Sequence, residues 1–372
     1  MKKSLIALAA VAATSAFAQS SVQLVGTFDP GVANQKTTYA NGNSVAQNLV
    51  FNNGQGTSQI TFKGTEDLGG GLKASFLYEN DFFARFDANG NSLLGKTNFG
   101  TGGGEQFLAL EGGAGKLQVG AANTPTLTAQ ASRQPIGTKI GSGFGTIMGT
   151  AHVRNNNSLV YSSPVFSGLS AQLGYAFKTN ADVNAATAYN LSTGASTASL
   201  NTKAVGDITD LGLNYANGPF RAGLSYYTVA AVAASAGVGT TIAATTAAAK
   251  NEQTNLYAQY DVAGATLYGG YHTEKTGTTL KADGWNVAVK YALTPSVNLL
   301  ANYGQLNDKL AANGDKKVTA IGAQYVLSKN TSLYARYVDE SYKNVSTAAS
   351  TTDGSFGVTG IKTALIGMQT NF

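Results

Sequence analysis

Few side chains in this sequence could perform acid–base, nucleophilic or metal chemistry. The 372 residues include two histidines, His152 and His272, and no cysteine. A catalytic histidine works with an orienting carboxylate and a nucleophile, and neither histidine has both nearby in the sequence. Two separated histidines without a thiol also fall short of a transition-metal ligand set. We therefore expect no catalytic residues, no metal and no cofactor, while calcium at loop carboxylates such as Asp308 and Asp315 stays open.

Basic side chains at regular spacing are the other candidates for chemistry. They occupy polar positions in segments where polar and apolar residues alternate, and they are Lys63, Lys73, Lys116, Lys178, Arg221, Lys290 and Arg336. Acidic residues are fewer at such positions, notably Glu79 and Glu105. A surface of this kind acts on ions and polar solutes through its electrostatic field rather than by making bonds. Its function depends on elements that point these side chains toward one water-filled space.

Alternation with a period of two runs along the whole chain. Residues 169–178, with the sequence LSAQLGYAFK, place apolar residues on one face and mainly polar ones on the other, and residues 220–226 and 285–293 repeat the pattern. This period is that of a β-strand with one apolar face. The composition agrees, because 45 glycines and 18 tyrosines disfavour a helical bundle, and a charged fraction of 12% is low for a soluble protein.

The connections between these segments alternate between short and long. Tight turns are predicted at 67–70, 112–115, 165–167, 217–218, 262–263, 294–296 and 328–330. Longer polar stretches fall at about 34–57, 83–104, 123–156, 180–203, 232–250, 276–280, 308–315 and 342–357. Seven turns and eight loops join sixteen strands.

This arrangement predicts an all-β fold, a 16-stranded antiparallel transmembrane β-barrel with short periplasmic turns and long extracellular loops. In hydrocarbon every backbone polar group needs a partner, which a closed sheet supplies. The basic side chains are expected to point inward, because an Arg or Lys facing the middle of the bilayer costs about 2–4 kcal/mol. A barrel of this size encloses an aqueous channel.

The first eighteen residues have the features of a secretory signal peptide. Lys2 and Lys3 form a basic region, residues 5–13 an apolar one, and residues 16–18 (AFA) a cleavage site of small residues. We therefore expect residues 1–18 to be removed and residues 19–372 to form the barrel domain. Without the two lysines, 23 basic residues face 20 acidic ones, an excess too small to indicate a nucleic-acid partner.

Several blocks of sequence resemble a known family. The last segment, residues 363–372, alternates and ends on Phe372, and it resembles the terminal signature that the insertion machinery of outer-membrane barrels reads. Four further blocks are QSSVQLVG at 19–26, FKGTEDLGGGLKA at 62–74, NSLVYSSP at 157–164 and YVLSKNTSLY at 325–334. Together they resemble the trimeric porins of β-proteobacteria, and they are spread over nearly the whole mature chain.

The resemblance implies a homotrimeric, non-enzymatic channel in the outer membrane of a Gram-negative bacterium, surrounded by membrane lipid. Ions and small hydrophilic solutes would diffuse through it passively. It also implies that the third loop, about residues 123–156, folds into the lumen and forms a constriction. The length of this loop agrees, because so long a loop in an economical barrel is usually functional. Arg133, Lys139 and Arg154 lie in it.

The chain departs from the family at constriction positions that often carry arginine. Gln59 and Val160 stand at two of them, and the third falls near Gly104 and Glu105, where no basic residue occurs. We therefore expect a pore that is weakly anion-selective or nearly non-selective, in place of the family's anion selectivity. The expected constriction and lining residues are Gln59, Lys63, Glu79, Glu105, Lys116, Arg133, Lys139, Arg154, Val160, Lys178, Arg221, Lys290 and Arg336.

Two other functions stay open at this point. A substrate-specific channel for small anionic or sugar solutes would use inward aromatic side chains, and Tyr227, Tyr257, Tyr268 and Tyr334 fall on the inward phase. An outer-membrane barrel enzyme is a remote alternative, because such enzymes pair a histidine with a serine or an aspartate and resemble barrels of fewer strands. The number of strands separates the enzyme from the channel.

Overall fold

The computed structural model describes residues 21–81, 104–131, 134–137, 139–143, 153–178, 185–190, 195–200, 206–233, 247–310, 314–345 and 357–372. The expected signal peptide, Arg133 and His152 lie outside these residues. The described chain is almost entirely β-strand and contains the short helix α2 (Pro125–Ala131). No helix in this part of the chain is long and apolar enough to cross a membrane.

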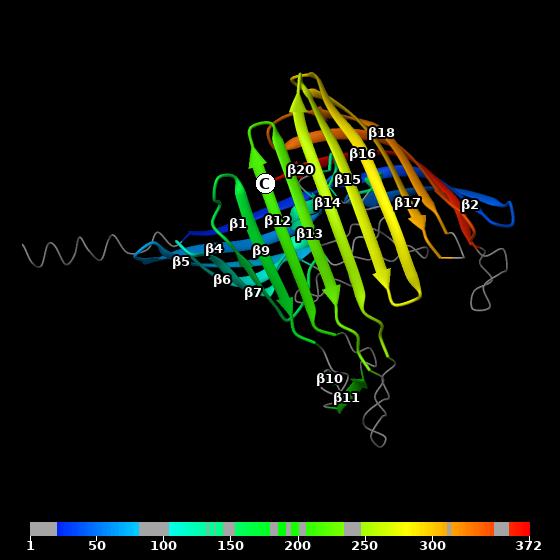
Figure 1. The fold of residues 1–372 in the computed structure, drawn as a ribbon. Coiled ribbons are helices and arrows are strands. Elements are labelled where there is room, and N and C mark those ends of the chain that lie inside the picture. Colours follow the sequence, from blue (N-terminus) through cyan, green and yellow to red (C-terminus); the bar gives the residue numbers. More distant parts are fainter. Residues whose placement is uncertain are drawn as a thin grey trace, which may run out of the picture.

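Eighteen strands form one sheet (Figure 1). They are β1 (Ser21–Phe28), β2 (Pro30–Tyr39), β3 (Ser44–Asn52), β4 (Gln59–Gly69), β5 (Leu72–Asp81), β6 (Gln106–Gly112), β7 (Gly115–Ala121), β8 (Ser158–Ser162), β9 (Leu169–Ala176), β12 (Ile208–Asn217), β13 (Phe220–Val229), β14 (Asn251–Val262), β15 (Ala265–Thr276), β16 (Leu280–Thr294), β17 (Val297–Asp308), β18 (Lys316–Val326), β19 (Thr331–Tyr342) and β20 (Val358–Asn371). A separate hairpin contains β10 (Ala185–Asn190) and β11 (Ala195–Leu200).

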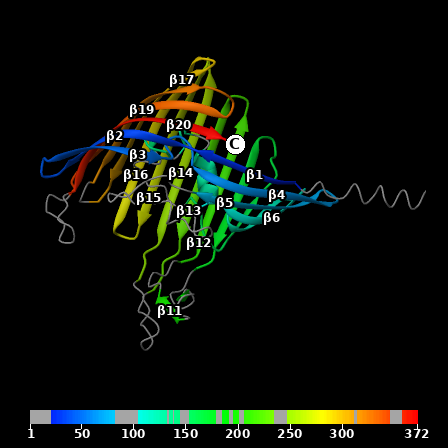
Figure 2. The same cartoon turned by 180° about the vertical axis from the view of Figure 1, so that it is seen from behind.

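The sheet closes into a barrel of sixteen wall strands, because two of these strands are bent. β1 pairs with β4 and β2 pairs with β3, so β1–β2 and β3–β4 are each one strand, bent at Asp29 and at residues 53–58. The last strand, β20, pairs with β19 on one side and with β1 and β2 on the other (Figure 2). All these pairings are antiparallel. The predicted fold class is confirmed.

Short connections lie at one end of the barrel and longer ones at the other. All seven predicted tight turns join neighbouring strands, for example residues 70–71 between β4 and β5 and residues 218–219 between β12 and β13. The connections at the opposite end include residues 122–157 between β7 and β8 and residues 230–250 between β13 and β14. In a barrel of this type the short turns lie on the periplasmic side and the long loops outside the cell.

The predicted first loop, 34–57, is wrong. β2 continues to Tyr39 and β3 begins at Ser44, so the connection at this point is residues 40–43. Most side chains of β3 are exposed, whichever face of the strand they occupy. With both faces exposed, the alternation of apolar and polar residues that marks the rest of the barrel is lost. The sequence pattern therefore resembles that of a loop although the backbone is paired.

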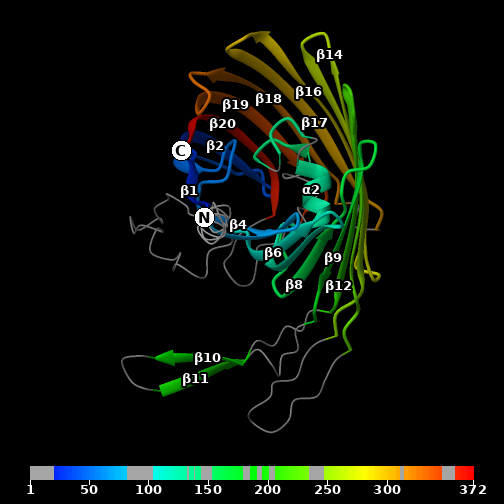
Figure 3. The ribbon, with the colours of Figure 1, turned by 90° about the vertical axis from the view of Figure 1, so that its left-hand side faces the viewer.

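Large apolar side chains mark the outer face of the wall. Leu173, Leu224 and Leu256 are exposed by 47%, 43% and 52%, as expected for residues that meet lipid. Toward the long-loop end the same face carries aromatic residues, among them Tyr271 and Trp285, exposed by 48% and 38%. The inner face of the wall carries helix α2, which lies inside the ring of strands and contacts β12, β13 and β14 (Figure 3).

Candidate functional site

A buried carboxylate fixes helix α2 to the inner wall. Asp210 on β12 is fully buried, and its Oδ2 accepts the backbone N–H of Thr126 at 3.0 Å while its Oδ1 accepts the Thr126 hydroxyl at 2.6 Å. Thr124 caps the same end of the helix, because its Oγ1 accepts the N–H of Leu127 at 3.0 Å. The loop therefore enters the lumen at a defined point on β12. The backbone N–H groups of Thr126 and Leu127, which have no partner within the first turn of α2, find acceptors there.

Glycines on neighbouring strands make room for α2. A β-carbon on Gly174 or Gly212 would lie 3.1 or 3.0 Å from an atom of Pro125, and one on Gly223 would lie 2.5 Å from the carbonyl oxygen of Ala129. The helix thus lies directly on the backbone of β9, β12 and β13. These contacts also identify which alternate residues of the three strands point into the lumen.

A side chain at Gly223 should push α2 off the wall. The branched side chain of Gly223→Val would overlap the Ala129 carbonyl, and overpacking of this kind costs about 1–3 kcal/mol. We expect α2 to move into the lumen and the single-channel conductance to fall. Gly269→Val is the matched control, because a β-carbon on Gly269 meets no atom within 4 Å. Equal conductance of the two variants in planar bilayers would contradict this position of α2.

The loop beyond α2 continues along the inner wall. Asn286 on β16 donates from Nδ2 to the Gln134 Oε1 at 2.9 Å, and Asn302 on β17 donates from Nδ2 to the Gly141 carbonyl at 2.9 Å. Ile140 packs against the side chains of buried residues on β14, β18 and β19. The described part of the loop therefore follows the wall from β12 to β19 and covers that side of the lumen.

Arg336 on β19 holds the far end of the loop. Its Nη1 donates to the carbonyl of Ile140 at 2.7 Å and to the carbonyl of Gly54 at 2.8 Å, and the residue is only 3% exposed. The guanidinium carbon also lies 5.7 Å from the centre of the Tyr334 ring. Arg336 thus points inward as expected, but the loop covers it, so its charge faces backbone carbonyls instead of open lumen.

Acidic and basic side chains gather where the loop returns to the wall. Arg154 Nη2 lies 2.7 Å from Asp81 Oδ2, and Arg154 Nη1 lies 3.5 Å from Glu79 Oε1. Arg154 Nη1 also donates to Asn123 Oδ1 at 3.3 Å, which joins the two ends of the loop. The Glu105 carboxylate accepts the N–H and the Nδ2 of Asn123 at 2.9 and 3.1 Å. Two carboxylates therefore compensate the charge of Arg154.

Gln59, one of the positions that depart from the family pattern, borders this cluster. Gln59 on β4 donates from Nε2 to Glu79 Oε2 at 2.5 Å. An amide at this position therefore solvates a carboxylate without neutralising it. Val160 on β8 is buried on the inward face and adds no charge.

Lys139 supplies the second cation of the described loop. Its Nζ donates to the Thr57 hydroxyl at 2.6 Å. Burial lowers the pKa of Lys139 below its ordinary value, while the nearby carboxylates of Asp81 and Asp29 act in the opposite direction. Its charge, like that of Arg154, thus lies within reach of carboxylates.

Three lysines face the lumen nearer the tight-turn end. Lys63, Lys116 and Lys290 alternate with outward apolar residues of β4, β7 and β16. Lys116 Nζ lies 4.7 Å from the centre of the Phe107 ring, a favourable cation–π distance. Within the described part of the chain none of the three forms an ion pair. Lys116 lies opposite Glu111 in the register of β6 and β7, while Lys63 and Lys290 lie opposite uncharged residues. The three lysines therefore form a basic zone below the loop that Glu111 compensates only in part.

The remaining predicted cations lie apart from this zone. Arg221 on β13 is paired with Asp261, with Nη1 and Oδ2 2.8 Å apart. Lys178 follows β9 at the long-loop end and is exposed, and its backbone N–H donates to Asp207 Oδ1 at 2.9 Å. Of the predicted residues, the structure brings together Gln59, Glu79, Glu105, Lys139 and Arg154.

Sequence reasoning missed three residues that organise the site: Asp81, Asn123 and Asp210. Asp81 lies two positions beyond Glu79 and shares its inward phase, so the alternation could have identified it. Asn123 and Asp210 act mainly on the backbone of the loop. The loop has no regular period, so no sequence pattern marks its partners.

The inward tyrosines support the loop and the wall. Tyr227 and Tyr257 are fully buried, and the Tyr227 hydroxyl donates to Asn155 Oδ1 at 3.2 Å. Tyr257 packs in the cluster that contains Ile140. The Tyr334 hydroxyl donates to Asp29 Oδ1 at 2.5 Å. These three side chains are covered, so they do not form an aromatic path for a solute.

The loop carboxylate Asp308 and the histidine His272, which the sequence singled out, both engage other groups of the chain. No group of three or more His, Asp or Glu side chains there could hold a metal ion. The Asp308 carboxylate already accepts the N–H groups of Leu310 and Gly314, at 2.9 and 3.0 Å. His272 is fully buried, with Nδ1 2.6 Å from Asn255 Oδ1.

Comparisons with known proteins agree with this architecture. A family model described as Gram-negative porin matches residues 4–345. An outer membrane porin protein of Bordetella pertussis is 28% identical over 375 residues, which are 90% of this chain and 93% of that protein. Outer membrane porin protein 32 of Delftia acidovorans is 35% identical, but the match covers 48% of this chain and 50% of that protein. The chain thus spans about half the length of that relative.

Among solved structures, the anion-selective porin from Comamonas acidovorans superposes with a TM-score of 0.71 at 24% identity. The match covers 95% of this chain and 100% of that chain. At this identity the likeness shows a common fold. It carries no information about which ions this lumen prefers.

Proposed function

This chain belongs to the Gram-negative porin family, and on that premise we propose that ions and small hydrophilic solutes diffuse passively through its lumen across the outer membrane. Porins are channels rather than enzymes. The observation that supports the proposal best is a closed sixteen-stranded wall with a loop fastened to one side of its interior. A barrel of this size leaves an aqueous channel beside such a loop.

Planar-bilayer recording tests this function directly. The full-length mature protein should produce stepwise increases of conductance, and proteoliposomes should take up neutral sugars at rates that fall with sugar size. A conductance that saturates or is blocked by one sugar or organic anion would favour a substrate-specific channel instead. A complete absence of conductance steps would overturn the proposal.

We also propose that the channel is weakly anion-selective. At the proposed constriction, Asp81 and Glu79 compensate Arg154, and Lys139 lies half-buried near the same carboxylates. In the described part of the chain Lys63, Lys116 and Lys290 near the tight-turn end form no ion pair, and of these three Lys116 alone has a carboxylate, that of Glu111, directly opposite it. Their field raises the local concentration of anions, but the surrounding salt screens this effect.

Removal of two of these lysines should abolish most of the preference. For Lys63→Gln combined with Lys290→Gln, we expect the reversal potential in a potassium chloride gradient to move toward zero or slightly to the cation side. The shift should shrink at high salt, because the Debye length falls to about 3 Å at 1 M. Lys329→Gln, in the turn between β18 and β19, is the control outside the lumen wall. An unchanged reversal potential in the double variant would refute this origin of selectivity.

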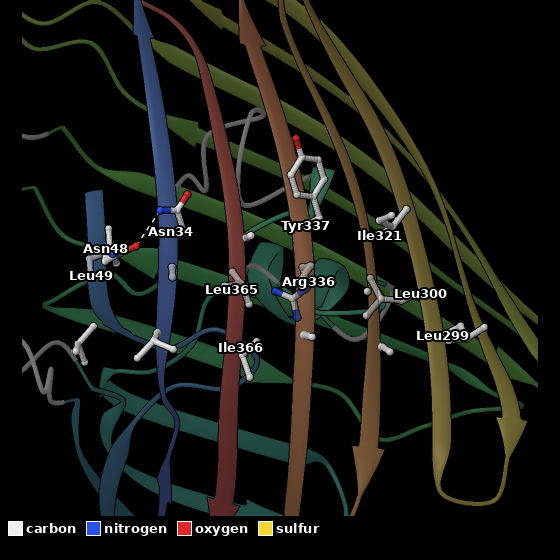
Figure 4. A pocket seen from close by; sticks show the side chains of 17 residues that line it. Asn34, Asn48, Leu49, Leu299, Leu300, Ile321, Arg336, Tyr337, Leu365 and Ile366 are labelled. Atoms are coloured by element: carbon white, nitrogen blue, oxygen red, sulfur yellow. Dashed lines mark hydrogen bonds between the residues drawn. The ribbon is translucent and has the colours of Figure 1, made fainter. Parts of the chain in front are cut away.

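A groove on the outer wall supports the homotrimer that the family resemblance implies. The groove, of about 1010 Å³, lies over β2, β3 and β17 to β20 (Figure 4). Val32 and Ile366 line it and are 59% and 62% exposed. Asn34 and Asn48 also line it, and the Asn34 Nδ2 donates to the Asn48 Oδ1 at 2.8 Å. Amide groups face lipid at a cost, so we propose that a second copy of the chain covers this groove.

A charge in the groove should therefore weaken the oligomer. For Ile366→Lys we expect dissociation of trimers into monomers, since a buried unpaired ammonium is strongly disfavoured. The matched control is Leu256→Lys, an outward position on β14 away from the groove. Native mass spectrometry of the detergent-extracted proteins checks both. Trimers of Ile366→Lys, or monomers of the unchanged chain, would contradict the proposed interface.

The seam of the barrel, where the last strand β20 pairs with the first strand β1, is consistent with a role of the C-terminal strand in assembly. The N–H of Phe372 donates to the Gly26 carbonyl at 3.1 Å, and the N–H of Gly26 donates to the Phe372 carbonyl at 3.0 Å. The Phe372 side chain stays 59% exposed. We propose that the insertion machinery reads this strand and its terminal aromatic residue before the seam closes.

A further inference from the structure

A second groove on the outer wall, near the long-loop end, carries basic side chains that the channel does not use. It has a volume of about 380 Å³ and lies on the hairpins formed by β14 to β17. Lys275 and Lys281 line it and are exposed. They share the outward phase with Tyr271 and Trp285, which are 48% and 38% exposed. These lysines therefore face the membrane side of the wall and not the lumen.

Lys275 and Lys281 stand directly opposite each other. They are cross-strand partners in the register of β15 and β16. Like charges in such positions repel and destabilise the pair. Within the described residues neither ammonium forms an ion pair. An anion between them would convert this repulsion into attraction.

Glu252 lies opposite Lys275 in the register of β14 and β15, and each outward carboxylate of this groove also pairs with a further lysine. Glu252 lies 2.7 Å from Lys250 Nζ and accepts the Tyr226 hydroxyl at 2.9 Å. Asp283 lies 2.8 Å from Lys309 Nζ and accepts the Asn307 Nδ2 at 2.8 Å. Four outward lysines thus face two carboxylates, and the groove carries a local positive charge.

The level of the lysine pair in the membrane follows from the register. Tyr271 and Trp285 are cross-strand partners on the same two strands, and the lysine pair lies four positions nearer the long-loop end. At about 3.4 Å per residue and a strand tilt of roughly 40°, the pair is about 10 Å farther out. Aromatic belts sit at the level of lipid headgroups. The lysines are thus placed to reach phosphates of the extracellular leaflet, and exposed apolar residues such as Leu256 lie on the membrane side.

We propose that this groove binds the phosphate group of a lipid headgroup in the extracellular leaflet, held between Lys275 and Lys281 with Lys309 beside it. The acyl chains of that lipid lie against the aromatic and apolar residues of β14 to β17. Charge-assisted hydrogen bonds from ammonium groups to phosphate oxygens supply the recognition. This inference rests on the membrane orientation of the proposed channel.

The test measures binding of a fluorescent diphosphorylated lipid A to the detergent-solubilised full-length oligomer. Lys275→Gln combined with Lys281→Gln should weaken binding by roughly 30-fold, from the usual contribution of lysines near anionic headgroups. The same lipid after removal of its phosphates should bind the unchanged protein and the variant equally. Lys329→Gln, at the periplasmic end, is the matched lysine control and should bind like the unchanged protein.

Other outcomes would overturn the proposal. Equal affinity of the double variant and the unchanged protein would show that the lysine pair does not hold the phosphate. Complete displacement of the lipid by equimolar inorganic phosphate would identify free phosphate as the ligand. Single-channel conductance of the double variant should be unchanged, because both lysines lie outside the lumen. An absence of conductance would therefore contradict the proposed channel function. An absence of lipid binding would contradict only the proposed role of the groove.

Discussion

Arg154→Ala is expected to make the channel cation-selective. The substitution removes the guanidinium that lies 2.7 Å from Asp81 and 3.5 Å from Glu79, so both carboxylates lose their main counter-charge. The negative field, chiefly that of Asp81, then acts at the proposed constriction. Loss of one partner from a largely buried ion pair also costs about 3 kcal/mol. The reversal potential in a salt gradient should change sign relative to the unchanged protein.

Two matched variants separate this effect from a general loss of positive charge. Arg221→Ala also removes an arginine from an inward Arg–Asp pair, but its partners are 42% and 39% exposed and lie near the tight turns. We expect a small shift of the reversal potential and a stability change of at most about 1 kcal/mol. Glu79→Gln combined with Asp81→Asn should shift the potential the other way, because it leaves Arg154 uncompensated. Equal shifts in Arg154→Ala and Arg221→Ala would refute the proposed position of Arg154 at the constriction.

Arg336→Met should release the far end of the third loop and raise the single-channel conductance. The substitution keeps an unbranched apolar stem but shortens the side chain and removes both hydrogen bonds, to the carbonyls of Ile140 and Gly54. Hydrogen bonds from a charged donor contribute about 1.5–3 kcal/mol each, so the tether weakens by about 3 kcal/mol or more. A loop that leaves the wall at this end should also produce frequent brief closures. Single-channel recording detects both changes.

The control for this variant is Lys73→Met, a cation near the turn between β4 and β5. It removes the same charge from the chain at a position remote from the loop. We expect its conductance and closure frequency to match those of the unchanged protein. If Arg336→Met behaves in the same way, the described part of the loop does not depend on Arg336 for its position.

The fold was readable from the sequence because each wall strand meets lipid on one face and water or the loop on the other. That contrast produces the alternation at residues 169–178, and the turns between strands carry local signals such as Asn217 and Gly218. The same reasoning failed at β3, where both faces are exposed and the contrast disappears. It also could not show that β1–β2 is one wall strand bent at Asp29.

The site was less readable, because its charges meet across long separations in the chain. Arg154 and Asp81 are 73 residues apart, and Arg336 and Ile140 are 196 residues apart. The alternation predicts that Arg336 points inward, but not that the loop covers it. Composition likewise shows a small basic excess, but not that Asp81 and Glu79 offset Arg154 while Lys63 and Lys290 stay unpaired.

The reversal potential of the unchanged channel in a potassium chloride gradient across a planar bilayer tests the central claim most directly. Compensated cations in the constriction and unpaired lysines below it predict a small potential on the anion side, which approaches zero as the salt concentration rises. A strong cation preference would contradict the account, because it would require the carboxylates of the constriction to act without Arg154 and Lys139. A strong anion preference that persists at high salt would contradict it equally, because it would require a free arginine at the narrowest point.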